Sequence, residues 1–444
     1  MNRIYIIIAF FSVFFNSAIG QNTAIQETIG RKCGTPKMSI QYEEAFQTLL
    51  QKNQKFANDR QASVVYNIPV VFHIIHSGQT IGTLYNISEA QVISQITTLN
   101  EDYRKLNADF SSWVTQSAFS SVSADCEISF CLAKVSPTGA LLAEPGINRI
   151  QASSKGWTNP PYVDTYIEST IKPNSYWDPA KYLNIWVVYM NDNTLGYAQF
   201  PTIPNPSNTT IGDLNGAGGA ANTDGVVLEY RALGNTGAAE APFNKGRTAA
   251  HEIGHWLGLY HINGDSNCGN DYCSDTPTQK DLSSGCPASA GITNASGCSA
   301  SPNPPGKMYQ NYMDYSDDKC MVMFTTSQKA RMQTVMGSCV RRSSLNSSTV
   351  CAIPTAISEY ESSVSFEVYP NPTNGELYID VSLMNIQDYT ISVLNALGQT
   401  IKQVQQIHTS GGKISMDLSD INPGMYFVTV QTLSGYKVKR LMLQ

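Results

Sequence analysis

The chain has few charged residues and lacks any dense cluster of basic ones. Asp, Glu, Lys and Arg make up 14% of its 444 residues, against about a quarter in an average soluble domain. Gly, Ser, Asn, Thr and Tyr are abundant in their place. This balance favours an extracellular protein over a cytosolic one. Because no run of Lys and Arg is present, we do not expect nucleic acid as a partner.

Long apolar runs are also missing, apart from one at the N-terminus. Residues 4–15 are almost wholly apolar and follow the basic residue Arg3. The small residues Ala18 and Gly20 occupy the −3 and −1 positions of a signal-peptidase site. The run is too short for a typical membrane-spanning helix. The pattern therefore predicts a secretory signal peptide over residues 1–20, with a membrane anchor as the alternative.

Histidine is scarce, yet half of the histidines stand in one short motif. The chain has 6 His, and three of them fall in HEIGHWLGLYH at 251–261. His251 and His255 are four residues apart, so on a helix they share one face and can hold one metal ion. Gly258 can take the left-handed conformation that ends a helix, and His261 can then return as a third ligand. Three imidazoles suit Zn²⁺ and leave its fourth position open.

Glu252 lies beside these ligands and indicates the reaction. In such a site the metal acidifies a bound water and polarises a peptide carbonyl, and Glu252 would serve as general base. A match at five fixed positions arises by chance in a chain of this length with a frequency on the order of one in several thousand. A helix with incidental histidines is one alternative. A zinc-bearing pseudoenzyme is another, and the retained Glu252 argues against it.

Hydrophobic periodicity predicts the main elements around this motif. The pattern switches between period two, which indicates strands, and helical spacing. Strands are expected at 64–75, 126–135, 183–190 and 224–230, and helices at 43–56, 88–106, 243–260 and about 327–336.

Further segments extend the motif into a family resemblance. NYMDYS at 311–316 looks like the Met-turn beneath the metal of metzincin proteases, with Met313 as its methionine. Together with DTP at 275–277 and FTTSQKARM at 324–332, the chain resembles the pappalysin family of metzincins, and within it the ulilysin-like enzymes. The resemblance covers roughly residues 60–340. It implies a two-lobed α/β (α+β) zinc-protease domain that cuts internal peptide bonds of proteins.

The resemblance also implies roles near the cleavage site. Tyr315 looks like the tyrosine that hydrogen-bonds the tetrahedral intermediate, with packing near the Met-turn as the alternative role. The segment Leu195, Gly196, Tyr197 and Ala198 is similar to the rim strand that pairs with extended substrate. Binding of that kind would favour proteins and peptides as substrates.

A calcium site is implied in the loop after the zinc motif. Asp271, Asp275 and Thr276 match the oxygen donors of the family there, and oxygen ligands suit Ca²⁺. Capping of turns by the two Asp residues is the alternative.

Ten cysteines suit an exported protein, because oxidising compartments favour disulfides. Five of them lie between residues 268 and 320, in a segment with little apolar material of its own. A structural zinc site there is disfavoured because the segment contains no His. The pairs that the resemblance implies are Cys268–Cys298 and Cys286–Cys320. Two further pairs are assigned without its support, which leaves Cys273 unpaired: Cys339–Cys351 and Cys126–Cys131.

Residues 21–60 look like a pro-segment, and Cys33 stands within it in RKCGT. A thiolate is a good zinc ligand and could occupy the open position of the metal. The segment resembles the cysteine-switch arrangement of latent metzincins. An ordinary disulfide is the alternative for Cys33. Processing near Arg60 would remove the segment.

The C-terminal part has a different pattern. Residues 341–363 are rich in Ser and Thr and predict a linker. Short β runs separated by turns indicate an all-β sandwich over residues 364–444. VYPNPTNGELYID and DLSDINPGMYFVTV in that part resemble the C-terminal sorting domain of the type IX secretion system. The resemblance implies the outer-membrane secretion machinery as a partner, and a sandwich that binds carbohydrate or a surface is the alternative.

The sequence thus predicts a zinc metalloendopeptidase, secreted or attached to the outer cell surface, with its catalytic domain over residues 61–340. It is expected to be a monomer that is latent until residues 21–60 are removed, with one catalytic Zn²⁺ and a structural Ca²⁺. A catalytically inactive zinc-binding surface adhesin is the alternative. Residues 321–350 contain no Asp or Glu, and only Asp317 and Asp318 lie nearby. A pocket that prefers a basic residue after the cleaved bond needs an acidic side chain. Such a preference is therefore not expected.

Overall fold

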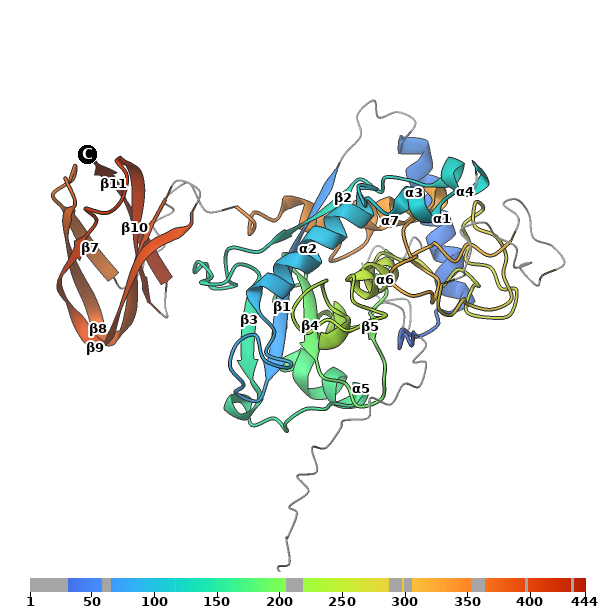
Figure 1. The fold of residues 1–444 in the computed structure, drawn as a ribbon, viewed down its shortest axis with the longest axis horizontal. Helices are drawn as coiled ribbons and strands as arrows, with labels where there is room; N and C mark the ends of the chain where they lie inside the picture. Colours follow the sequence, from blue (N-terminus) through green and yellow to red (C-terminus); the bar gives the residue numbers. More distant parts are fainter. Residues whose placement is uncertain are drawn as a thin grey trace, which may run out of the picture.

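A computed structural model of the chain describes residues 31–57, 65–115, 117–204, 219–286, 298, 306–352, 364–395, 398–432 and 435–444. Figure 1 shows a larger α/β body and a separate all-β body at the C-terminal end. The predicted signal peptide and the expected processing site at Arg60 lie outside the described residues. Within the described part of the chain, no helix combines the length and the apolar character needed to cross a membrane.

A mostly parallel sheet organises the larger body. Its strand order is β2-β1-β4-β6-β5, and β3 pairs with β1 beyond the end of β2. All strands are parallel to their neighbours except the last, β5, which is antiparallel to β6. The strands are β1 (Tyr66–His76), β2 (Ile128–Leu132), β3 (Ile147–Gln151), β4 (Leu183–Val188), β5 (Gly196–Ala198) and β6 (Val226–Glu229). Because β5 is the terminal strand, its outer edge can pair with another extended chain.

The central strand β1 explains why the sheet is buried on both faces. Val70, Phe72 and Ile74 pack into the main core, whereas Val71 and Ile75 belong to clusters on the other side. This alternation follows from the period of two in a strand. Parallel sheets covered on both faces are typically encoded by such near-continuous apolar runs.

Two of the three main helices of the larger body, which contains the predicted catalytic domain and is called the catalytic body below, lie close to the prediction. α2 (Glu89–Tyr103) begins after Ser88, whose Oγ accepts the Gln91 N–H. α7 (Thr326–Ser338) begins with a capping box formed by Thr325 and Gln328. α6 (Arg247–Trp256), which carries the zinc motif, is shorter than the predicted 243–260. It starts only after a residue of positive φ and ends one turn before the last histidine of the motif.

Shorter helices cover the remaining surfaces. Ile167 and Ile171 lie in a segment that packs against Ile75 and Trp186 on the sheet face opposite α2 and α6. These helices are α3 (Phe110–Trp113), α4 (Ser117–Val122), η1 (Ala152–Lys155), α5 (Asp164–Tyr166), η2 (Ile167–Ile171), η3 (Lys172–Asn174), η4 (Ala221–Thr223), η5 (Tyr230–Ala232) and η6 (Ser343–Ser347).

The described part of the predicted pro-segment folds onto the catalytic body. Helix α1 (Ile40–Ala57) packs on α7. Tyr42 and Phe46 of α1 are fully buried members of the main core. The helix is somewhat longer than the predicted 43–56 and forms an integral part of the described structure.

The expected linker begins later than predicted. Arg342 and Leu345 are 0% and 1% exposed, and Arg342 donates hydrogen bonds to Asp224 and to the Trp256 carbonyl oxygen. Residues 341–352 therefore belong to the catalytic body. The prediction relied on the many small Ser residues of this segment. A few large side chains among them nevertheless supply the packing.

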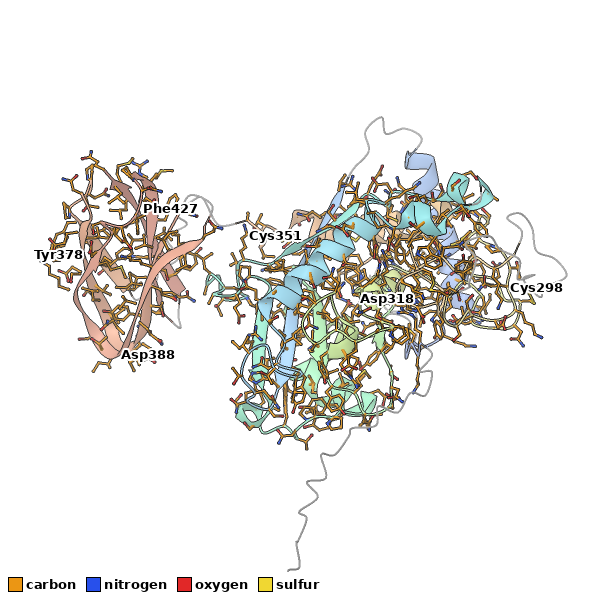
Figure 2. All side chains as sticks on the ribbon, viewed as in Figure 1. Cys298, Asp318, Cys351, Tyr378, Asp388 and Phe427 are labelled. Atoms are coloured by element: carbon orange, nitrogen blue, oxygen red, sulfur yellow. A yellow bond between two sulfur atoms is a disulfide. The ribbon has the colours of Figure 1, made fainter. Side chains whose placement is uncertain are left out.

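The disulfides confirm two predicted pairs and correct two others. Cys268–Cys298 and Cys286–Cys320 are formed. The assignments Cys339–Cys351 and Cys126–Cys131 are wrong, because Cys131 is bonded to Cys351; Figure 2 labels Cys351 near the end of the catalytic body. Cys126 and Cys339 point into the main core and remain buried thiols. Cys273 is unpaired, as predicted.

The C-terminal body confirms the predicted all-β class. Its strands are β7 (Val364–Tyr369), β8 (Glu376–Leu394), β9 (Thr400–Asp417), β10 (Gly424–Thr432) and β11 (Gly435–Leu443). β7 pairs with the first half of β8 and β10 with the second half, and register shifts separate the halves. Side chains from both halves, such as Ile379 and Ile391, share one core. The long strand therefore bends across two facing layers of a sandwich.

Candidate active site

Helix α6 and the turn after it bring three histidines together. His251 and His255 are 0% and 1% exposed on one face of the helix. Gly258 has a φ of +86°, the left-handed conformation predicted for it. The chain reverses there, and His261, which is 6% exposed, faces the other two rings.

Hydrogen bonds fix the orientation of the three rings. Nδ1 of His251 donates to the Tyr312 carbonyl oxygen at 2.6 Å, and Nδ1 of His255 donates to a carbonyl oxygen of the following turn at 2.7 Å. Nδ1 of His261 donates to the Asp265 carboxylate. With the protons on Nδ1, each Nε2 presents a lone pair. Burial lowers the pKa of His255 to about 3, so this ring is neutral at neutral pH.

The geometry of these nitrogens fits a metal ion. Nε2 of His255 lies 3.2 Å from Nε2 of His251 and 3.1 Å from Nε2 of His261. Facing lone pairs repel at this distance unless a cation lies between them, and tetrahedral bonds of about 2.0–2.1 Å separate ligand nitrogens by roughly 3.3 Å. Sγ of Cys33 belongs to the same set, in which all ligand atoms lie within 4.8 Å of one another. Among the described residues, this is the one such group of metal-ligating side chains.

Glu252 faces this cluster from the same helix. Its carboxylate is 1% exposed, and Oε2 accepts hydrogen bonds from the Cys33 thiol at 3.2 Å and from the Thr35 hydroxyl at 3.1 Å. Burial raises the pKa of Glu252 to about 7, against the two hydrogen bonds, which lower it. A carboxyl group poised near neutrality is suited to accept and return a proton.

The segment predicted to be a Met-turn packs against α6. Met313 is fully buried, and a Cβ added to Gly254 on α6 would lie 2.5 Å from its Sδ. The methionine side chain thus packs directly against the helix backbone at Gly254, where a larger residue would have to displace it. The Met313 carbonyl oxygen accepts the Ile262 N–H at 3.0 Å, which ties this turn to the segment that carries His261.

Tyr315 lies over the histidine cluster. Its ring centroid is 5.0 Å from that of His261 and 5.8 Å from that of His251. Burial and the neighbouring Cys33 and Glu252 raise the pKa of its hydroxyl. The hydroxyl therefore stays protonated and can donate a hydrogen bond near the metal position.

The predicted pro-segment occupies the edge of β5. Cys33 pairs with Gly196 in parallel orientation. The Leu195 N–H donates to the Lys32 carbonyl oxygen, and the Gly34 N–H donates to that of Gly196, both at 2.9 Å. Gly196 has no room for a side chain, because a Cβ would lie 2.9 Å from Cγ of Glu252. The predicted substrate strand, which continues through the buried Tyr197 and Ala198, thus holds the pro-segment in this structure.

Arg31 fills a pocket beside the cluster. Its guanidinium pairs with Asp318 at 2.6 Å, and both side chains are at most 1% exposed. Nη1 donates to the Thr248 hydroxyl at 3.0 Å, and the group lies 5.0 Å from the centre of the Phe243 ring. Figure 2 labels Asp318 inside the catalytic body. The pocket is therefore lined by one carboxylate and an aromatic face, a combination that suits a basic side chain.

The oxygens of the expected calcium loop make hydrogen bonds within the protein. The Thr276 hydroxyl lies 2.8 Å from a carboxylate oxygen of Asp271. Asp275 accepts the Thr325 hydroxyl at 2.7 Å and the Ser327 N–H at 2.8 Å, at the start of α7. Asp275 thus caps the start of α7, whereas Asp271 makes the kind of local turn contact considered as the alternative, by accepting the Cys273 N–H at 3.1 Å.

Sequence reasoning missed two contributors to the site and discounted a third. Asp265 stands four residues after His261, a local spacing that could have been noticed. Thr35 stands two residues after Cys33, where an extended chain points both side chains the same way. Asp318 was considered and set aside, because nothing in the sequence connects it with Arg31.

Comparisons with known proteins place the chain among metalloproteases. A family model described as pregnancy-associated plasma protein-A matches residues 165–337, and one described as a secretion system C-terminal sorting domain matches residues 367–444. An extracellular metalloprotease of Verticillium alfalfae is 30% identical over 307 residues, 68% of this chain and 87% of the relative. One of Podospora anserina is 31% identical over 319 residues, 70% of this chain and 90% of the relative.

Solved structures of mirolysin are also similar to this chain. Mature mirolysin of Tannerella forsythia, in complex with a cleaved peptide, is 36% identical with a TM-score of 0.52; the match covers 64% of this chain and 97% of that one. A promirolysin mutant of Tannerella forsythia is 34% identical with a TM-score of 0.55, covering 71% of this chain and 97% of that one.

Proposed function

Since the chain belongs to the pappalysin family of metalloproteases, we propose that His251, His255 and His261 hold a catalytic Zn²⁺ and that Glu252 is the general base. The chain is an exported metalloendopeptidase that acts on proteins. The observation that carries the zinc assignment is the convergence of three Nε2 atoms, with that of His255 lying 3.2 and 3.1 Å from those of the other two rings. Two of the rings donate through Nδ1 to main-chain carbonyl oxygens and one to a carboxylate.

Each residue of the site then has a role in hydrolysis. A bound zinc ion would acidify water and polarise the substrate carbonyl. Glu252 takes the proton of the attacking water and returns it to the leaving amine. Tyr315 donates a hydrogen bond from its hydroxyl to the oxygen that gains negative charge. The edge of β5 orients the substrate through backbone hydrogen bonds.

The same contacts support latency of the precursor. Cys33 places its sulfur among the metal-ligating nitrogens, where it would take the position of the water. The Thr35 hydroxyl bonds to Glu252 and also accepts the Ala198 N–H at 2.9 Å. The precursor form of mirolysin matches a larger share of this chain than the mature form does, which supports a removable segment over residues 21–60. At its other end, we infer that the catalytic domain continues to residue 352, because Arg342 and Leu345 are buried in it.

The C-terminal sandwich is the secretion sorting domain that its family model describes. The protein is therefore secreted or attached to the outer cell surface. We infer that the sandwich is recognised by the outer-membrane machinery of the type IX system. Exported metalloproteases as relatives also favour the enzyme over the inactive surface adhesin considered as the alternative.

The metal assignment is tested by zinc content and by chelation. Mature protein is expected to contain one zinc, to lose proteolysis of a protein substrate with a strong chelator, and to recover it with added Zn²⁺. Asp265→Asn should retain less zinc against a competing chelator, by about 10–100-fold in affinity, because Asp265 holds the His261 ring. Asp281→Asn, at a largely exposed carboxylate, is the matched control. Equal zinc retention in both variants would contradict the role of Asp265.

The Arg31 pocket leads to a prediction about specificity that reverses the sequence expectation. The pro-segment runs parallel to β5. A peptide that crossed the metal in the direction of a substrate would itself be hydrolysed, whereas the pro-segment has to persist in the precursor. We therefore infer that substrate runs in the opposite direction. The pocket two residues before Cys33 then receives the side chain that follows the cleaved bond. Asp318 favours Arg or Lys there.

Mass spectrometry of a digested protein mixture should show Arg or Lys directly after most cuts. Asp318→Asn keeps an acceptor for the N–H groups of Lys245 and Arg247 but loses the charge. Its ratio of kcat/KM for basic over apolar side chains should fall about 10–100-fold. Asp317→Asn should leave the ratio unchanged. Cuts that show no preference for Arg or Lys directly after the cleaved bond would sink this assignment.

Calcium in the loop containing Asp271, Asp275 and Thr276 stays a prediction. The buried carboxyl group of Asp271 has a pKa raised by burial to about 7, an environment that a bound cation would relieve. A rise in the thermal unfolding midpoint with added Ca²⁺, reduced in Asp271→Asn, would support it; no shift with Ca²⁺ would count against it.

A further inference from the structure

Helix α1 covers a surface of the catalytic body that is built for it. The Tyr42 hydroxyl donates to the Pro201 carbonyl oxygen at 2.9 Å, and its ring meets that of Phe200 edge-on at 6.0 Å. Phe46 is fully buried against the turn after α6. We call this surface the α1 groove; its lining residues are Phe200, Pro201, Gly258, Tyr260, Tyr272 and Arg331.

A buried arginine lies at the centre of the α1 groove. Arg331 is 0% exposed, and its Nη1 and Nη2 donate to the two carboxylate oxygens of Glu43 at 2.6 and 2.9 Å. The guanidinium lies 4.3 Å from the centre of the Phe46 ring, and Nη2 also donates to the Gly258 carbonyl oxygen at 3.0 Å. Departure of the pro-segment removes both the carboxylate and the ring. The guanidinium then keeps its hydrogen bond to the Gly258 carbonyl oxygen but loses its ion-pair partner, so its free N–H groups can bind a replacement carboxylate.

The α1 groove is continuous with the active site. From Cys33 the pro-segment passes a hollow lined by Pro36, Met38, Ala198 and Phe200 before α1 begins. The Phe200 ring contacts Tyr42 on one side and lies 5.7 Å from the ring of His255 on the other. A substrate that runs opposite to the pro-segment therefore directs its residues upstream of the cleaved bond toward the α1 groove.

We propose that in the mature enzyme the α1 groove is an exosite for substrate proteins that carry an acidic residue among aromatic ones, upstream of the cleaved bond. The carboxylate takes the place of Glu43 on Arg331, and the aromatic rings take the places of Tyr42 and Phe46. The inference rests on the proposed function, because it requires removal of the pro-segment and a protease that binds extended chains.

Two fluorogenic peptides that share one cleavage segment test the exosite on the mature enzyme. One is short, and the other carries the sequence from Ile40 to Asn53 upstream, joined by a flexible linker of about ten residues. The longer peptide should be cut with a kcat/KM at least about tenfold higher. Replacing its glutamate at the Glu43 position by Gln should abolish the advantage. Equal kcat/KM values for the two peptides would overturn the proposal.

Variants of enzyme and peptide separate the exosite from the catalytic reaction. In Arg331→Gln the ratio of kcat/KM for the long over the short peptide should fall to about one, whatever its rate on the short peptide. Because Arg331 also holds Gly258, that variant can fail to fold, and the Glu43→Gln peptide tests the same ion pair on an unaltered enzyme. If neither peptide is cut, the proposed function fails. Fluorescence anisotropy of the free Ile40–Asn53 peptide then decides the exosite alone, and equal affinity of its Glu43→Gln form would refute it.

Discussion

Mature enzyme carrying Glu252→Gln is expected to hydrolyse peptides with a kcat/KM lower by a factor of about 10²–10⁴, the usual contribution of a positioned general base. The amide has nearly the shape of the carboxylate but cannot accept the proton of the attacking water. Glu252 is outside the set of metal-ligating atoms, so zinc content should be unchanged. Initial rates on a quenched peptide and zinc analysis of the same sample would measure both.

Glu101→Gln is the matched control for this variant, because it removes an exposed carboxylate from α2. It should retain wild-type activity. A Glu252→Gln enzyme within a few-fold of the wild type, with full zinc content, would exclude Glu252 as the base and would direct attention to Tyr315.

Full-length precursor carrying Cys33→Ala is expected to lose its latency. The substitution removes the sulfur from the metal-ligating group and one hydrogen bond to Glu252. Autoprocessing and cleavage of a short peptide should begin at least about tenfold faster, which corresponds to a loss of roughly 1.4 kcal/mol of binding. Precursor samples taken over time and separated by electrophoresis would show it.

Thr35→Val separates the contribution of Thr35 to latency from that of Cys33. It keeps Cys33 but removes the hydroxyl between Glu252 and the Ala198 N–H, so latency should weaken less than in Cys33→Ala. Thr48→Val, on the exposed side of α1, is the control and should stay as latent as the wild type. A Cys33→Ala precursor that is as latent as the wild type would show that α1 and the Arg31 pocket suffice for inhibition.

The parts of the site that were predictable are those within one short segment. The spacing of His251 and His255 fixes their common face, and Gly258 has the positive φ that the reversal toward His261 requires. The contact between Asp265 and His261 could have been predicted in the same way, because the two residues are only four positions apart. The helix itself was predicted too long, because buried apolar residues after 256 resemble a helical face while they pack in a turn.

The contacts that were not predictable join distant parts of the chain. Arg31 and Asp318 are 287 residues apart, and Cys131 and Cys351 are 220 apart. One sequence contains the residue types but not their proximity, so the pocket and the disulfide pairing required the fold. The charge of Asp318 was visible, yet its meaning depended on a partner in the pro-segment.

The Cys131–Cys351 disulfide has a mechanical consequence. It joins β2 of the central sheet to one of the last described residues of the catalytic body. Force applied through the C-terminal sandwich, during export or while the protein is held at a surface, reaches this covalent bond before it reaches α7. The load then passes into the sheet along β2. The helix that carries Arg331, and with it the turn at Gly258, is spared the tension.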